Sequence, residues 1–103
     1  MPKKYIVSTP FGDEKVTIHI GKYASNSNTF IQLKCEDGEP FAFLTTNFEK
    51  RLPFDEAYVD TNNCPWAEQF IRKYGLGEQL NRFKLSGYCC YPLYKFYIFN
   101  SGD

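Results

Sequence analysis

The chain has 103 residues, of which 43% are hydrophobic and 23% are charged. This length and composition predict one folded domain over residues 1–103 and exclude an intrinsically disordered protein. The twelve basic and twelve acidic residues cancel, so no net charge attracts the chain to nucleic acid or to an anionic membrane.

Residues 1–23 contain no sustained apolar run that could act as an export signal. No other segment is long and apolar enough to cross a bilayer. We therefore expect a cytoplasmic protein with no membrane partner. In that compartment the four cysteines are reduced thiols: Cys35, Cys64, Cys89 and Cys90.

The first half of the chain predicts antiparallel strands. A short strand over Lys4–Thr9 precedes turn residues at 10–13. Residues 15–23 then alternate between apolar and polar side chains, which indicates a strand with one buried face made of Val16, Ile18 and Ile20. Two further strands, residues 31–35 and 41–48, are joined by a tight hairpin turn at the Asp-Gly pair 37–38.

The second half predicts a helix over residues 62–76. Asn62 or Asn63 can cap its start, and Gly75 occupies the place of a left-handed C-terminal cap. The aromatic and aliphatic residues between these ends recur every three or four positions, as on one face of a helix: Trp66, Phe70, Ile71 and Tyr74.

Shorter elements surround this helix. Residues 57–60 predict a short strand before it, residues 78–83 a short turn of helix after it, and residues 87–100 a final strand or pair of strands. The fold class is therefore α+β, with a mainly antiparallel meander of five or six strands packed with one principal helix.

The final strand is unusually aromatic, because residues 88–99 carry six rings on both parities. One face of such a strand can join the core, and the other must meet a second layer or a partner. Since a tyrosine hydroxyl needs water or a hydrogen-bond partner, we expect the face with Tyr91 and Tyr97 to be the contact surface and Phe96 to be buried. The candidate interface is Tyr91, Tyr94, Tyr97 and Phe99, with Tyr91 and Tyr97 as its centre. Pro92 confines the strand to a sheet edge, a bulge or a break, and an edge would allow a partner strand to pair with it.

Four stretches resemble an uncharacterised bacterial family, domain of unknown function 4313. They are GKYA at residues 21–24, IQL at 31–33, EDGEPFA at 36–42 and YGL at 74–76, within a resemblance that spans residues 15–98. The resemblance implies a small bacterial protein, often encoded among genes of mobile elements, and it brings no activity, cofactor or catalytic residue. The Cys89–Cys90 pair and the aromatic residues after it depart from the family pattern.

The residues predict no enzyme. His19 is the only histidine, and it falls on the polar parity of its strand, as an ordinary surface residue does. The cysteines lack the spacing of a zinc site, and we expect them to be small buried hydrophobic residues. The glycines form no phosphate-binding loop, and the acid pairs lie at solvated turns. We therefore expect no catalytic, metal-binding or cofactor-binding residues.

The preferred function is a protein-interaction module, such as an accessory or anti-defence factor of a mobile element that binds a host protein. Homodimerisation would use the same aromatic surface. The alternative is binding of single-stranded nucleic acid through sheet aromatics, and the neutral charge of the chain predicts that this binding is weak. An acidic mimic of DNA is disfavoured by the same neutrality, although residues 36–60 are rich in acids.

Overall fold

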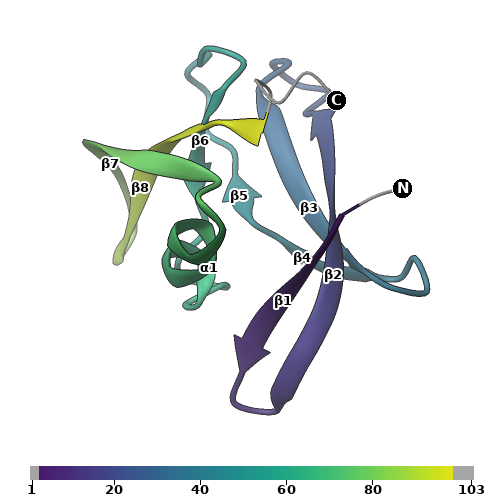
Figure 1. Ribbon diagram of the computed structural model, residues 1–103. Coiled ribbons are helices and arrows are strands. Elements are labelled where there is room, and N and C mark those ends of the chain that lie inside the picture. The colour runs from purple at the N-terminus through teal and green to yellow at the C-terminus, as the bar shows by residue number, and fades with distance from the viewer. Residues whose placement is uncertain (1–2, 99–103) are drawn as a thin grey trace.

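The computed structural model describes residues 3–98, which form two four-stranded antiparallel sheets and one helix (Figure 1). The first sheet has the order β1-β2-β3-β4 and contains β1 (Lys4–Thr9), β2 (Gly12–Lys22), β3 (Thr29–Cys35) and β4 (Pro40–Phe43). The strand expected over residues 15–23 is confirmed as β2, with Val16 fully buried, Ile18 half-buried and His19 exposed. The expectation that Ile20 lies on the buried face is wrong, because Ile20 is 46% exposed. The β3–β4 turn contains Gly38 with a φ of 90°, as expected for its Asp-Gly pair.

The chain crosses from the first sheet to the second at Leu44. This residue donates its backbone N–H to the carbonyl of Ile31 at 2.8 Å, and its own carbonyl accepts the N–H of Asp60 at 2.9 Å. Its side chain is completely buried, so the crossing point is held from both sides. The single strand expected over residues 41–48 is therefore divided into β4 and the two-residue strand β5 (Thr45–Thr46).

The second sheet has the order β5-β6-β8-β7 and includes β6 (Glu56–Val59), β7 (Gly77–Ser86) and β8 (Cys89–Phe96). The expectation of a single meander of five or six strands is thus wrong, because the bend at Leu44 separates two sheets. The short turn of helix expected over residues 78–83 is also wrong. These residues belong to β7, which pairs with β8 along most of its length.

The helix α1 (Ala67–Tyr74) is shorter than the expected 62–76. Asn62 and Asn63 do not cap it. Instead, the side chain of Asp60 accepts hydrogen bonds from the backbone N–H of Asn63 at 3.2 Å and from its side-chain amide at 2.9 Å, and the chain turns before the helix starts. The predicted stop is confirmed, because Gly75 has a φ of 61° and caps the C-terminus.

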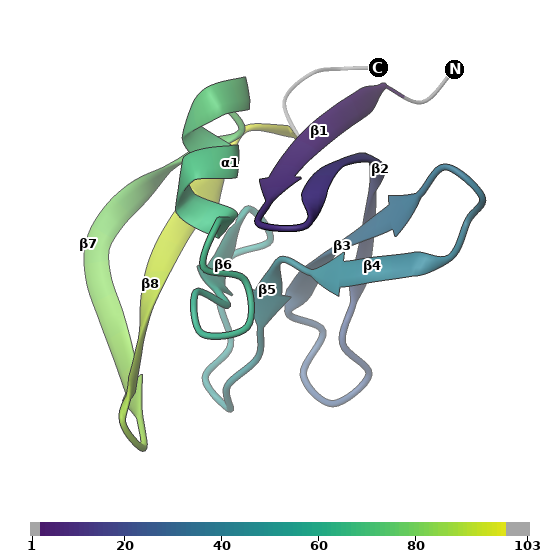
Figure 2. The ribbon, with the colours of Figure 1, turned by 90° about the horizontal axis from the view of Figure 1, so that it is seen from below.

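The core lies between the two sheets, and α1 bridges them (Figure 2). On the side of the first sheet, the Tyr74 hydroxyl accepts the backbone N–H of Ile6 at 2.8 Å, and the Tyr74 ring packs edge-on against Tyr5 at 4.9 Å between centroids. On the side of the second sheet, Glu68 of the helix accepts a hydrogen bond from the hydroxyl of Tyr94. The helix therefore occupies the outer edge of β1 and the inner face of β8.

Candidate functional site

The β7–β8 hairpin extends past the other elements as a two-stranded arm, which we define as residues 82–91 (Figure 2). In the arm, Phe83 lies opposite Pro92, Lys84 opposite Tyr91, and Leu85 opposite Cys90. Gly87, with a φ of 61°, forms the turn at the tip. Because residues directly opposite each other in an antiparallel pair share a face, this register assigns the side chains of the arm to two faces.

A bulge separates the arm from the base of the hairpin. The register between β7 and β8 shifts between Gln79 and Phe83, and Asn81 adopts a positive φ of 58° there. At the base, Gly77 approaches β8 so closely that a Cβ atom would lie 2.4 Å from the carbonyl oxygen of Lys95. The strands are therefore tightly paired at the base, and the bulge interrupts the regular pairing between the base and the arm.

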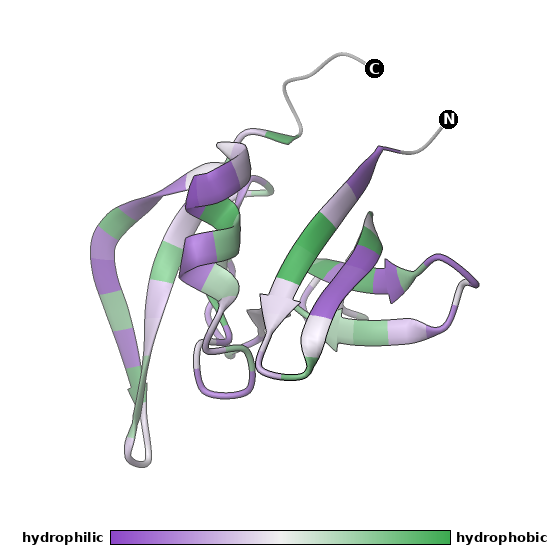
Figure 3. Ribbon diagram, turned by 60° about the horizontal axis from the view of Figure 1, so that its bottom comes forward, coloured by the Kyte–Doolittle hydropathy of each residue, from purple (hydrophilic) through white to green (hydrophobic). Residues whose placement is uncertain are grey.

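One face of the arm is apolar and open to solvent. It carries Phe83, which is 53% exposed, Leu85, which is 74% exposed, and the exposed thiol of Cys90, with Tyr88 fully exposed at the tip. Cys90 shares its strand parity with Tyr94, so this face continues the one that packs in the core. We call these four residues the apolar arm face. Figure 3 shows hydrophobic and hydrophilic residues alternating along β7.

The other face of the arm packs against the loop after β5. The ring of Tyr91 lies 5.5 Å from that of Phe48 between centroids, and Phe48 packs edge-on against Tyr58 at 5.3 Å. The ammonium group of Lys84 lies 5.7 Å from the Phe48 ring. A hydrogen bond with the Cys89 thiol raises the pKa of the Tyr91 hydroxyl. This aromatic contact anchors the base of the arm and leaves the apolar arm face free.

The structure divides the predicted interface residues. Phe96 is 1% exposed, which confirms its place in the core, and Tyr94 is 5% exposed. The expectation that Tyr94 is an interface residue is therefore wrong, because its ring packs in the core and its hydroxyl is bonded to Glu68. Burial and this bond raise the pKa of Tyr94 above its ordinary value.

The remaining predicted residues do not form one surface. Tyr91 is half-buried against Phe48, whereas Tyr97 is exposed and donates a hydrogen bond to Glu78, which raises the pKa of the Tyr97 hydroxyl. Phe99 lies outside the described residues. β8 lies between β6 and β7, but β6 pairs only with residues 93–95, so residues 89–92 pair with β7 alone and form an edge on their other side. Pro92 is the last residue of this edge segment and lies opposite the residue where the bulge in β7 ends, in agreement with the alternatives of edge and bulge.

Sequence reasoning missed the apolar arm face. Its signal was the alternation of basic and apolar residues over 82–85, followed by a turn glycine at 87. This pattern is typical of a strand that leads into a hairpin. The turn of helix predicted over residues 78–83 does not account for it.

The cysteines differ in their environments more than expected. Cys64 is buried, and burial together with the charge of Asp60 raises its thiol pKa to about 11. Cys35 and Cys89 are partly buried, and Cys90 is exposed. The expectation of buried cysteines thus holds for Cys64 and is wrong for Cys90, which the arm carries into solvent.

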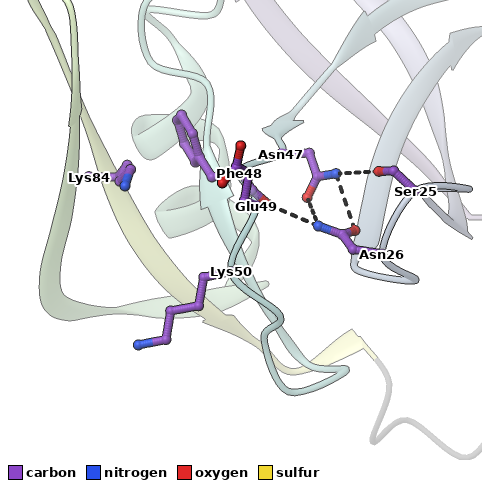
Figure 4. A pocket seen from close by; sticks show the side chains of 7 residues that line it. All are labelled: Ser25, Asn26, Asn47, Phe48, Glu49, Lys50 and Lys84. Atoms are coloured by element: carbon purple, nitrogen blue, oxygen red, sulfur yellow. Dashed lines mark hydrogen bonds between the residues drawn. The ribbon is translucent and has the colours of Figure 1, made fainter.

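A polar hollow of about 870 Å³ lies beside the arm, between the loop after β2 and the loop after β5 (Figure 4). It is lined by Ser25, Asn26, Asn47, Phe48, Glu49, Lys50 and Lys84. Lys50 and Lys84 line the hollow from segments that are distant in sequence, and Figure 4 shows the Lys50 side chain pointing away from Asn26 and Asn47. Neither lysine forms an ion pair with another residue in the range 3–98.

One wall of this hollow is fixed by an asparagine network. The side chain of Asn28 is buried, donates to the Asn47 side chain at 3.1 Å and to the Lys50 carbonyl at 2.9 Å, and accepts the N–H of Leu52 at 2.8 Å. Asn26 donates to the Phe48 carbonyl at 2.8 Å. These hydrogen bonds connect the loop after β2 to the loop after β5, so the asparagine amide groups have a structural role in shaping the hollow.

The acid-rich stretch 36–60 does not form a continuous belt. Asp60 is buried at the start of the turn before α1, whereas Glu36 pairs with Lys4 on the first sheet at 2.6 Å. The Lys4 ammonium lowers the pKa of the Glu36 carboxyl. Asp60 and Glu36, at the two ends of this stretch, therefore do not lie on one acidic surface.

Within residues 3–98, no helix is long and apolar enough to cross a membrane. In the same range, no three side chains of histidine, cysteine, aspartate or glutamate gather as metal ligands. No curated protein matches the chain, and no solved structure does. The family model of a domain of unknown function, DUF4313, matches residues 17–101, and the chain therefore belongs to that family.

Proposed function

We propose that the protein is a protein-binding module whose contact surface is the β7–β8 arm. The observation that carries the proposal is the apolar arm face. It continues the core face of the second sheet into solvent. Phe83 and Leu85 are both more than half exposed there. Exposed phenylalanine, leucine and tyrosine side chains on one protruding element are typical of a recognition surface. The resemblance set out above leads us to propose a host-cell protein as the partner, with the chain acting as an accessory or anti-defence factor.

The edge of the arm supports binding by strand addition. β7 pairs with β8 on one side, and no other described strand pairs with it on its second side. A strand of a partner can therefore extend the sheet along residues 82–86, with main-chain hydrogen bonds supplying affinity and side chains supplying selectivity. Arg82 and Lys84 are exposed there, so the favoured partner strand alternates apolar and acidic residues.

Charge disfavours a second copy of the chain as the partner. Antiparallel pairing of two β7 strands with Phe83 opposite its own copy places Arg82 opposite Lys84, and pairing with Phe83 opposite Leu85 places Lys84 opposite its own copy. Both registers oppose like charges, which destabilises a strand pair. We therefore expect a monomer in isolation, and self-association through this edge is the weaker variant of the proposal.

The proposal is tested with a double variant, Phe83→Ser with Leu85→Ser. Both side chains are exposed, so the fold should remain intact while affinity for the natural partner falls by at least about tenfold, or 1.4 kcal/mol. The partner is first captured from lysate of the native host, identified and purified, and its affinity is then measured by calorimetry. Ile20→Ser is the matched control, because Ile20 is an exposed apolar residue of the first sheet.

Nuclear magnetic resonance locates the contact independently of affinity. Amide shifts of residues 82–90 should change on addition of the purified partner, and those of β2 should not. If the double variant binds as the unmodified chain does and the shifts change elsewhere, the arm is not the contact surface.

A second candidate function, single-stranded nucleic-acid binding, is favoured by the polar hollow of Figure 4. Lys50 and Lys84, which form no ion pair within residues 3–98, offer a phosphate contact. The test is fluorescence anisotropy with a labelled oligothymidine at two salt concentrations. Binding should be micromolar at most and should weaken steeply with salt. Tight binding at physiological salt that is lost in Lys50→Gln with Lys84→Gln would place this function above protein binding.

A further inference from the structure

A second groove lies between the β1–β2 turn, β4 and the residues just before α1. It has a volume of about 480 Å³, and its lining is mostly aromatic and proline side chains, namely Pro10, Phe11, Phe41, Pro65 and Trp66, together with Thr9, Gly12, Asp13 and Glu14. It shares no residue with the arm. Phe11 is fully exposed beside it, so this groove carries its own recognition chemistry.

The floor of the groove is a fixed aromatic pair. The rings of Phe41 and Trp66 lie 5.8 Å apart between centroids at an angle of 41°, and Trp66 also packs edge-on against Phe70 of α1 at 5.9 Å. These contacts hold the indole in place. Its N–H donates to no other group among the residues that the structure describes and is not buried, so it is available to a carbonyl group of a ligand.

The groove continues into an acidic hollow. Asp13 and Glu14 line both, and the hollow of about 410 Å³ adds Glu36 and Asp37 from the β3–β4 turn, against one lysine, Lys15. Glu36 is already paired with a lysine, but Asp13, Glu14 and Asp37 form no ion pair within residues 3–98. A ligand that leaves the aromatic groove on this side therefore meets excess negative charge.

The thiol of Cys35 reports the same negative potential. It lies in the acidic hollow, and its pKa is raised, chiefly by a hydrogen bond with Glu14 and further by desolvation and by the charges of Glu14, Asp37 and Glu39. An environment that disfavours a thiolate favours a cation.

We propose that this groove binds an extended, proline-rich segment of another protein that carries arginine or lysine at one end. Aromatic grooves accept proline rings because the polyproline conformation is already extended and loses little entropy on binding. Trp66 lines the groove, and its indole N–H, which is bonded to no other described residue, suits the exposed carbonyl groups of such a segment. The adjoining acids Asp13, Glu14 and Asp37 supply negative charge that complements the basic end of the segment. A neutral or acidic segment would lack this charge complementarity.

Trp66 provides a direct assay, because it is the only tryptophan in the chain. The probe is a synthetic decapeptide of proline and leucine residues that ends in two arginines and contains no aromatic residue. Its addition should change the emission of Trp66 in a saturable way, and the affinity should fall as salt is raised. A peptide with glutamates in place of the arginines should bind at least about fivefold more weakly, since two surface ion pairs are lost.

Variants of the chain test the same contacts from the other side. Phe11→Ala removes an exposed ring and should weaken the arginine peptide several-fold without changing the thermal transition. Asp13→Asn with Glu14→Gln should reduce affinity about fivefold and flatten its salt dependence. Glu49→Gln, an acid remote from the groove, is the matched control.

The arm variant Phe83→Ser with Leu85→Ser should bind the peptide as the unmodified chain does, which separates this inference from the proposed function. The inference is overturned if Trp66 emission does not respond to millimolar peptide, or if the glutamate peptide binds equally well. It is also overturned if the groove variants leave the affinity unchanged. Concentration-dependent dimerisation that Phe11→Ala abolishes, without peptide binding, would instead assign the groove to a second copy of the chain.

Discussion

Replacing Phe96 by alanine should lower the free energy of unfolding by about 3–5 kcal/mol. The side chain is 1% exposed and belongs to the core cluster that joins both sheets and the helix. Its backbone N–H is bonded to the Asp55 carbonyl at 2.7 Å, and its strand is paired on both sides. The backbone therefore cannot move inward to fill the space, and the variant retains most of the cavity.

The adjacent residue is a matched control. Tyr97 is 40% exposed, and its hydroxyl is bonded to Glu78 at the surface. Tyr97→Ala removes a ring of similar size from a position one residue away, and it should cost less than about 1 kcal/mol. The difference between the two variants therefore measures burial, since the change in side-chain volume is similar.

Urea denaturation followed by far-ultraviolet circular dichroism measures both variants. With a slope of about 1.5 kcal/mol/M, a loss of 4 kcal/mol lowers the midpoint by about 2.7 M, and the melting temperature should fall by roughly 20 °C. If Phe96→Ala does not fold, Phe96→Leu should still show a loss of about 1 kcal/mol. The reasoning is refuted if Tyr97→Ala costs as much as Phe96→Ala, because β8 would then present its other face to the core.

Three further outcomes follow from buried groups. Asn28→Ala should cost about 1–3 kcal/mol, because it leaves the partly buried backbone groups of Lys50 and Leu52, in the loop after β5, without the bonds that Asn28 supplies. Hydrogen exchange in that loop should accelerate, whereas Asn62→Ala, at an exposed position, should have no effect. Because the pKa of Tyr94 is raised in the folded state, the stability that it contributes is present below its unfolded value near 10 and is lost as pH rises through the folded value. Tyr94→Phe should remove that loss from an alkaline unfolding titration, and an unchanged titration would refute the assignment. In labelling with a thiol reagent near neutral pH, Cys90 should react first and Cys64, buried with a pKa of about 11, should react only on unfolding. Equal rates at the two thiols would contradict the assigned burial.

Local patterns predicted the first sheet well. The apolar and polar residues of β2 alternate in sequence, the Asp-Gly pair sets the β3–β4 turn, and Gly75 ends the helix. Each of these features depends on residues that are close in sequence, so the side chains needed for the inference are visible together. The register and the strand order of the first sheet follow from such hairpins.

Features that depend on distant residues could not be predicted in the same way. The bend at Leu44 is set by hydrogen bonds to Ile31 and Asp60, which are more than ten positions away on either side. The late start of α1 follows from the side chain of Asp60, which binds Asn63 before the asparagine can cap a helix. Neither set of hydrogen bonds can be predicted from the local sequence pattern, because each requires the tertiary structure that brings the partners together.

The expectation that Tyr94 belongs to the interface failed for a related reason. A hydroxyl group needs a partner, but that partner can be protein, and Glu68 of α1 supplies it to Tyr94, 26 positions further along the chain. The tyrosine can then be buried at little cost. Phenylalanine and leucine meanwhile are exposed on the arm, so the polarity of a side chain did not identify which residues of this sheet are exposed to solvent.

A difference in length explains why the apolar arm face is uncovered. The helix α1 has eight residues and is about 12 Å long, whereas the ten residues of β7 extend to about 33 Å. The helix covers the core face near Tyr94 and Gly77 and cannot reach the tip. Roughly 20 Å of a strand pair therefore continues past the helix with the same alternation that builds the core. An apolar face of that length, on a sheet edge with basic residues, matches the dimensions of a five- or six-residue partner strand.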